Sequence, residues 1–138
     1  MRQRLHEGDA APAFNVTDMS GHAVNLNSTA GKYLLLTFMR YSGCPYCNLA
    51  LHRLALEYPR LQQHGCEVIA FVQSSKHDIS SNIYDRHAVK PAFPIVADPA
   101  MHTYEEYGVS TSVTAALRDV KNLPYWVHAV REHGFTQK

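Results

Sequence analysis

The sequence contains few cysteines and no long apolar run. Three cysteines in 138 residues, an odd number, exclude a fold held together by a set of disulfide bonds. The longest apolar run, residues 33–39, has seven residues and includes a threonine. Because a membrane-spanning helix needs roughly 20 apolar residues, we expect no membrane-spanning segment.

An excess of charge of one sign is also missing. The chain carries 13 lysines and arginines against 12 aspartates and glutamates, a net charge of +1. A protein that binds nucleic acid or an anionic membrane would carry a basic face, so we expect neither partner. Residues 1–7 lack the apolar segment of a secretory signal, and we therefore expect a cytoplasmic protein.

Signals for cofactors and metals are scarce as well. The sequence has no glycine-rich phosphate loop, and no cofactor is expected. The nine histidines are scattered along the chain and never take the His-Glu-x-x-His spacing of zinc enzymes. We interpret them as surface or packing residues and expect no metal site.

The length and composition are those of one globular domain. The chain is long enough for one compact domain, 46% of its residues are hydrophobic, and it shows no repeat, low-complexity segment or linker. We therefore expect a single domain spanning residues 1–138.

Local patterns predict a hairpin followed by alternating strands and helices. Alternating apolar residues around an Asp-Met-Ser-Gly turn predict a hairpin over residues 13–17 and 22–26. Apolar runs predict three later strands, the first of them buried on both faces: 33–39, 68–72 and 93–97. Helices are predicted between and after these strands: about 45–64, 75–88 and 98–107. This order is typical of an α/β fold with a mostly parallel sheet flanked by helices.

Prolines, serines and glycines mark the helix ends. Pro59 lies inside the first helical pattern, so we expect a kink or a break there. Ser74 or Ser75 can cap the second helix, and Gly108 ends the third. Beyond Gly108 the pattern predicts two short helices: about 113–120 and 125–134.

The most informative segment is the dithiol Cys44-Pro45-Tyr46-Cys47, which directly follows a predicted strand and opens a helix. A cysteine at a helix N-terminus faces backbone N–H groups and the positive end of the helix dipole, and both favour the thiolate. We therefore predict that the pKa of Cys44 lies below the ordinary value of about 8.5 and that Cys44 is a nucleophile. Cys47 lies three residues after Cys44 on the same helix face. It can therefore react with an oxidised Cys44 and form a disulfide with it.

Two other interpretations of the dithiol compete with the redox one. A zinc site would need His64 and Cys66 as further ligands, but a helix rising about 1.5 Å per residue puts His64 roughly 25 Å from Cys47. Zinc–ligand bonds are only about 2.0–2.3 Å long. A pair of ordinary buried cysteines is the other interpretation, and the spacing at a strand–helix corner disfavours it. Cys66 is interpreted as a small buried hydrophobic residue.

Together these features resemble the peroxiredoxin-like AhpC/TSA family of the thioredoxin superfamily. The resemblance covers about residues 8–108. It rests on an opening Gly-Asp-x-x-Pro-x-Phe followed by the dithiol and two later segments: 8–14, 38–47, 65–70 and 93–98. Cys-Pro-Tyr-Cys also matches the dithiol motif of glutaredoxins. The implied structure is a thioredoxin-like fold with a peroxiredoxin-type N-terminal hairpin.

The resemblance implies a thiol peroxidase with an antioxidant role. Cys44 would attack the O–O bond of a hydroperoxide and become a sulfenic acid, and Cys47 would condense with it. An external dithiol such as thioredoxin or glutaredoxin would then reduce the disulfide. Neighbouring residues are the candidates for binding substrate: Arg40, Tyr41, Ser42, Pro45 and Tyr46.

The sequence departs from the family pattern around the first cysteine. Peroxiredoxins place proline seven residues, and threonine or serine three residues, before the reactive cysteine, where this chain has Thr37 and Tyr41. The hydroxyl that positions the peroxide would come from Tyr41 or Ser42, or be absent. Arg40, or the more distant Arg118, would replace the family's arginine. The alternatives are therefore a thiol–disulfide oxidoreductase or redox sensor without peroxidase activity, and a non-enzymatic interaction module.

A second departure lies at the C-terminal end. Thioredoxin folds finish with a β-hairpin and a helix, whereas no convincing pair of strands follows Gly108. We expect this hairpin to be missing and the domain to be incomplete or divergent there. The apolar strand 33–39 would then have an open edge, and open edges pair with other chains. We therefore expect a homodimer or a strand-exchanged assembly.

Overall fold

The predicted hairpin is present in the computed structural model, which describes residues 4–28 and 33–109. Strands β1 (Asn15–Thr17) and β2 (Ala23–Asn25) pair in antiparallel register. The Asp18 carboxylate accepts hydrogen bonds from the backbone N–H groups of Ser20 and His22, both at 2.9 Å. Gly21 has a φ of +85°, which glycine adopts without a steric penalty. This turn confirms the hairpin predicted from the alternation.

A parallel sheet forms the centre of the described fold, as predicted. Its strands are β3 (Tyr33–Met39), β4 (Cys66–Val72) and β5 (Ile95–Ala97), in the spatial order β3-β4-β5. The structure thus places β4, and not β3, in the middle of the sheet.

The prediction that strand 33–39 is buried on both faces is wrong. Tyr33 is 68% exposed and Leu35 39% exposed, whereas residues 68–72 of β4 are at most 1% exposed. The physical reason is position: within the described residues, β3 is an edge strand and β4 has a neighbour on each side. An apolar run alone does not distinguish the two.

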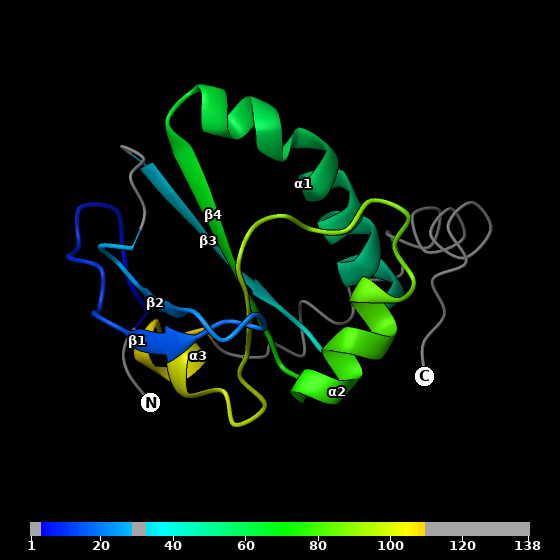
Figure 1. Ribbon diagram of the computed structural model, residues 1–138. Coiled ribbons are helices and arrows are strands. Elements are labelled where there is room, and N and C mark those ends of the chain that lie inside the picture. The colour runs from blue at the N-terminus through cyan, green and yellow to red at the C-terminus, as the bar shows by residue number, and fades with distance from the viewer. Residues whose placement is uncertain (1–3, 29–32, 110–138) are drawn as a thin grey trace.

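The two faces of β4 pack against different layers. Its side chains alternate, so Val68, Ala70 and Val72 join one core cluster and Ile69 and Phe71 join another. The first cluster is completed by helix α1 (Pro45–Gln63) and the segment after β4, and the second by the hairpin and helix α3 (His102–Glu106). Figure 1 shows α1 and α2 on one side of the sheet and the hairpin with α3 on the other.

Helix α1 continues through Pro59, so the alternative of a break at that residue is wrong. Proline removes one backbone hydrogen bond from a helix, but tertiary contacts hold this one on both sides. The Tyr58 ring packs edge-on against Phe93 at 5.4 Å, and its hydroxyl donates to Glu67 at 2.7 Å. Packing against the sheet therefore offsets the local preference.

The second helix is much shorter than predicted. Ser75 caps α2 (Lys76–Ile79) by accepting a hydrogen bond from the Asp78 N–H at 3.2 Å, which confirms the predicted cap. The chain then widens into a π-helical turn, η1 (Ser80–Tyr84), and does not continue to residue 88. Serine and asparagine side chains compete for backbone hydrogen bonds, so this stretch is a poor α-helix.

The third helix also begins later than predicted. The Asp98 carboxylate accepts from the backbone N–H groups of His102 and Thr103, and Gly108, with a φ of +66°, follows the end of α3. None of the helices in the described ranges is long and apolar enough to cross a bilayer. The helices predicted at 113–120 and 125–134, Arg118 and the expected loss of a C-terminal hairpin all lie outside the described residues.

Candidate active site

The dithiol lies where the predicted strand–helix corner places it. Cys44 is the N-cap residue of α1, with an extended backbone (φ −68°, ψ 122°), and Pro45 opens the helix. The Cys44 N–H donates to the Tyr41 carbonyl at 3.1 Å, which closes a tight turn after β3. The Cys44 sulfur is therefore positioned beside the first backbone N–H groups of the helix.

The Cys44 thiol is acidified by this position. A hydrogen bond from the Cys47 thiol is the largest cause, and the backbone N–H groups of Cys47 and Tyr46 and the Arg40 charge act in the same direction. Burial opposes ionisation, but the net effect lowers the pKa of Cys44 to about 6. The thiolate, which is the nucleophilic form, is thus the major form at neutral pH.

Cys47 shows the opposite behaviour. Its hydrogen bond to the Cys44 sulfur, its burial and the adjacent negative charge all raise the pKa of Cys47 well above the ordinary range. The two sulfurs lie within hydrogen-bonding reach and carry one negative charge between them, located on Cys44. This asymmetry supports the predicted division between a nucleophile and a resolving thiol.

Both sulfurs are enclosed. Cys44 is 2% exposed and Cys47 9% exposed, and neither forms a disulfide. Pro45 is buried and Tyr46 half-buried. A protein disulfide can therefore reach Cys44 only if the residues around this thiol move apart. A small molecule can reach it with a smaller movement.

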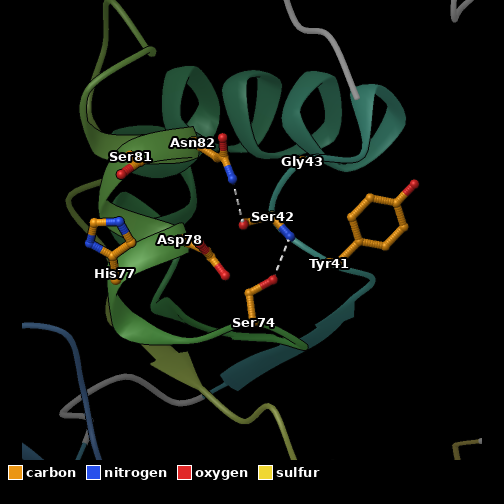
Figure 2. Close-up of a pocket in the computed structure, with 8 residues that line it drawn as sticks. All are labelled: Tyr41, Ser42, Gly43, Ser74, His77, Asp78, Ser81 and Asn82. Atoms are coloured by element: carbon orange, nitrogen blue, oxygen red, sulfur yellow. Dashed lines mark hydrogen bonds between the residues drawn. The ribbon is translucent and has the colours of Figure 1, made fainter. Parts of the chain in front are cut away.

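Arg40 and Tyr41 contribute charge and a hydroxyl beside the dithiol. The guanidinium carbon of Arg40 lies 5.8 Å from the centre of the Tyr41 ring. Burial, and then the negative Cys44, raises the pKa of Tyr41, so its hydroxyl keeps a proton to donate. In Figure 2 the Tyr41 ring points away from the serines grouped around Ser42.

A polar pocket of about 430 Å³ adjoins the loop that precedes Cys44. Figure 2 shows its lining residues: Tyr41, Ser42, Gly43, Ser74, His77, Asp78, Ser81 and Asn82. Ser42 is 2% exposed, and its hydroxyl accepts a hydrogen bond from the Asn82 amide at 3.1 Å. Of the two candidate hydroxyls for positioning a peroxide, that of Ser42 therefore already accepts one hydrogen bond from the protein.

The structure adds residues that the sequence analysis did not assign to the site. The sequence indicates Ser74 only as a possible helix cap and His87 only as a surface or packing residue, and it gives no role to Asn48 or Asn82. A signal existed for Asn48, a polar residue at helical spacing from Leu51, Ala55 and Tyr58, which are buried on α1. Within residues 4–28 and 33–109, no three potential metal-ligating side chains gather at one point.

Comparison with known families settles the family. Residues 7–125 match the model of the AhpC/TSA family. The chain belongs to the AhpC/TSA family. This agrees with the resemblance inferred from the opening Gly-Asp-x-x-Pro-x-Phe and the dithiol.

The curated relatives carry two kinds of names. A putative chloroplastic peroxiredoxin Q of Oryza sativa subsp. indica is 25% identical over 114 residues, covering 83% of this chain and 51% of that protein. The chain is 29% identical over 119 residues to the thiol-disulfide oxidoreductase ResA of Bacillus anthracis, covering 86% of this chain and 66%, just under two thirds, of that protein.

Solved structures support the thioredoxin-like fold. The thioredoxin domain of a thiol-disulfide oxidoreductase from Bacteroides vulgatus superposes with a TM-score of 0.64 at 25% identity, covering 78% of this chain and 76% of that one. Mycobacterium bovis AhpC superposes with a TM-score of 0.67 at 13% identity, covering 80% and 71% respectively. The AhpC likeness shows the fold alone.

Proposed function

We propose that this AhpC/TSA protein is a thiol-dependent oxidoreductase that exchanges disulfides through Cys44 and Cys47. The observation that carries the proposal is the pairing of an acidified Cys44 with a protonated Cys47 within hydrogen-bonding reach. One thiolate beside one thiol at a helix N-terminus is the arrangement that thiol–disulfide exchange requires. The names of the ResA relatives and of the Bacteroides structure support the same chemistry.

The reaction would run in two exchange steps. The Cys44 thiolate attacks one sulfur of a substrate disulfide, that S–S bond breaks, and the departing sulfur takes up a proton. Cys47 then loses its proton and attacks the Cys44 sulfur of the mixed disulfide, which releases the second substrate thiol. The substrate gains two electrons, and the protein is left with a Cys44–Cys47 disulfide. An external dithiol of the thioredoxin or glutaredoxin type would then reduce the Cys44–Cys47 disulfide and restore both thiols.

Peroxide reduction is the second candidate function. The enclosure of Cys44 favours it, because a small hydroperoxide needs less opening than a protein. Cys44 would attack one peroxide oxygen, an alcohol or water would leave, and Cys47 would displace water from the sulfenic acid to form the disulfide. Thr37 and Tyr41, at the positions where peroxiredoxins have proline and threonine, weigh against an efficient peroxidase.

Substitution of the nucleophile tests the assignment. Cys44→Ser should lower the rate of insulin disulfide reduction, with dithiothreitol as the final reductant, by at least about 100-fold, because the attacking thiolate is gone. Cys47→Ser should accumulate a mixed disulfide at Cys44, visible by mass spectrometry. Cys66→Ser is the matched control and should retain the rate of the unmodified protein.

The same proteins distinguish the candidate functions. Peroxide consumption with dithiothreitol, lost in Cys44→Ser, would select the peroxidase. Insulin reduction without peroxide turnover would select disulfide exchange. Neither activity, together with a Cys44 pKa near the ordinary value, would contradict both proposals and indicate a non-enzymatic interaction module.

Compartment and assembly are proposed on sequence grounds. We propose that the protein is cytoplasmic. Thioredoxin and glutathione systems keep thiols reduced in that compartment, and a reductant of this type would restore the Cys44–Cys47 dithiol. We also propose a homodimer that forms along the β3 edge, where Tyr33 and Leu35 are exposed. Edge strands with apolar side chains pair readily with a second chain.

A further inference from the structure

Ser42, two residues before Cys44, is held at all three of its polar groups. Its N–H donates to the Ser74 hydroxyl at 2.8 Å, and its own hydroxyl accepts from the Asn82 amide at 3.1 Å. Its carbonyl accepts from the Asn48 amide at 2.6 Å. Figure 2 shows the first two of these bonds meeting at Ser42. Three separate segments of the chain therefore fix one buried loop residue.

Asn48 connects this residue to the nucleophile. Its amide nitrogen donates both to the Ser42 carbonyl and to the Cys44 carbonyl, the latter at 3.0 Å, so it bridges the two residues that flank Gly43. Asn48 is only 1% exposed. The loop that carries Cys44 is thus tied to the first turn of α1 through a side chain as well as through the backbone.

The two carbonyls fix which way the Asn48 amide points, and His87 binds the other end of that amide. With its nitrogen donating to two carbonyls, Asn48 must present its oxygen to the His87 Nε2 atom, which lies 2.7 Å away. That nitrogen must therefore carry a hydrogen and donate it, since a flipped amide would direct oxygen at two carbonyl oxygens. His87 is 3% exposed and follows η1, 39 residues after Asn48 in the sequence.

We propose that Asn48, bound by His87, is a positioning residue that fixes the loop before Cys44 and thereby sets the reactivity of that thiol. The inference rests on the proposed function, in which Cys44 is the nucleophile. Asn48 acts through the backbone and does not touch the substrate.

The physical argument runs through the helix N-terminus. Cys44 is acidified in part by the backbone N–H groups of Tyr46 and Cys47, so its own backbone must be held in register with that first turn. Without Asn48, the Ser42 and Cys44 carbonyls lose a donor and the loop can rotate away from these N–H groups. A thiolate that moves away from these N–H groups and from the positive end of the helix dipole is destabilised relative to the thiol.

The Asn48 side chain also contributes to stability. Its removal takes the amide donor from the buried Ser42 carbonyl, whereas the Cys44 carbonyl keeps the backbone N–H of residue 48. A buried acceptor left without a donor destabilises the fold. The positioning role therefore needs a readout at the Cys44 thiol that a loss of stability alone does not move.

The test is the pH dependence of Cys44 alkylation in the reduced protein, with the modified site identified by mass spectrometry. Asn48→Ala and His87→Phe should each raise the pH midpoint of iodoacetamide reaction at Cys44 by about one unit, as expected for loss of a hydrogen bond to a charged group. His87→Gln, whose amide can still donate to Asn48, should keep the midpoint within about half a unit of the unmodified protein's.

Two further variants separate positioning from folding. Val68→Ala, in the centre of the sheet, should lower the thermal midpoint without moving the alkylation midpoint. Ser74→Ala removes only the acceptor of the Ser42 N–H and should raise the alkylation midpoint of Cys44 by less than Asn48→Ala does. This variant tests the positioning of the loop even if His87→Phe does not fold.

The outcomes are distinct from those for the proposed function. Variants that lose thermal stability while keeping the alkylation midpoint of the unmodified protein would overturn the positioning role, as would His87→Gln shifting as far as His87→Phe. Because alkylation needs no substrate, a shifted midpoint in a protein without oxidoreductase activity would uphold the positioning role and overturn the function alone.

Discussion

At the scale of single residues, the site depends on one proton shared unequally between two sulfurs. Cys44 gives up its proton easily because Cys47, two backbone N–H groups and the Arg40 charge stabilise the thiolate. Cys47 retains its proton because it donates to that thiolate. The position of Cys44 and Cys47 was predictable from spacing, since residues three apart share a helix face.

The pH dependence of stability follows from this asymmetry. Free cysteine has a pKa of about 8.5, above the value of about 6 for folded Cys44. Between about pH 6 and 8.5 the unfolded chain binds more protons at these thiols, so the free energy of unfolding rises with pH. Above about pH 8.5 the unfolded chain releases both protons while folded Cys47 keeps one, so the free energy of unfolding falls.

Urea denaturation of the reduced protein from pH 5.5 to pH 9.5 would measure this curve. The double variant Cys44→Ser/Cys47→Ser is the control, because all other titrating groups are unchanged. The difference between the two curves should peak near pH 8.5. A flat difference would mean that the dithiol is not perturbed by folding.

At the scale of secondary-structure elements, packing decided several features that local sequence left ambiguous. Apolar runs predicted β3 and β4 equally well, and only sheet order made one an edge and the other the centre. Ser75 caps α2 as predicted, whereas the chain widens into η1 at Ser80, Ser81 and Asn82, residue types with a low preference for the helix interior. The same π-helical turn contains Asn82, which binds Ser42.

Helix α1 offers a direct test of local preference against packing. Pro59 is exposed and lacks the N–H that would continue the helical hydrogen bonds. Pro59→Ala should therefore raise the free energy of unfolding by about 1–3 kcal/mol, measured by urea denaturation. Alkylation of Cys44 should be unchanged, because the substitution lies at the other end of the helix. A destabilised variant would show that the proline ring itself contributes to packing.

At the scale of the whole molecule, the exposed edge of β3 is the surface through which we predict that two copies of the chain pair. Within the described residues β3 pairs on one side only, and Tyr33 and Leu35 are exposed along it. The homodimer stays a prediction that rests on this edge and on the expected lack of a C-terminal hairpin.

Light scattering coupled to size exclusion would measure the mass directly. We expect twice the mass of the 15.5 kDa chain, and a monomer for Leu35→Lys, because a charge on an exposed edge strand disfavours pairing. Leu56→Lys, at a leucine of α1 that is 54% exposed, makes the same change of charge and should remain a dimer. A monomer for the unmodified protein at working concentration would contradict the prediction.

The sequence by itself determined the family, the order of strands and helices, and the dithiol at a helix start, because these depend on spacing and on neighbours along the chain. Tertiary structure alone decided which strand is central, how deeply both sulfurs are enclosed, and that α1 continues past Pro59. It also brought Ser74 and Asn82 to Ser42, and His87 to Asn48, from 32 to 40 residues away. Such contacts leave no periodic pattern, since each depends on where the sheet places the segment that carries it.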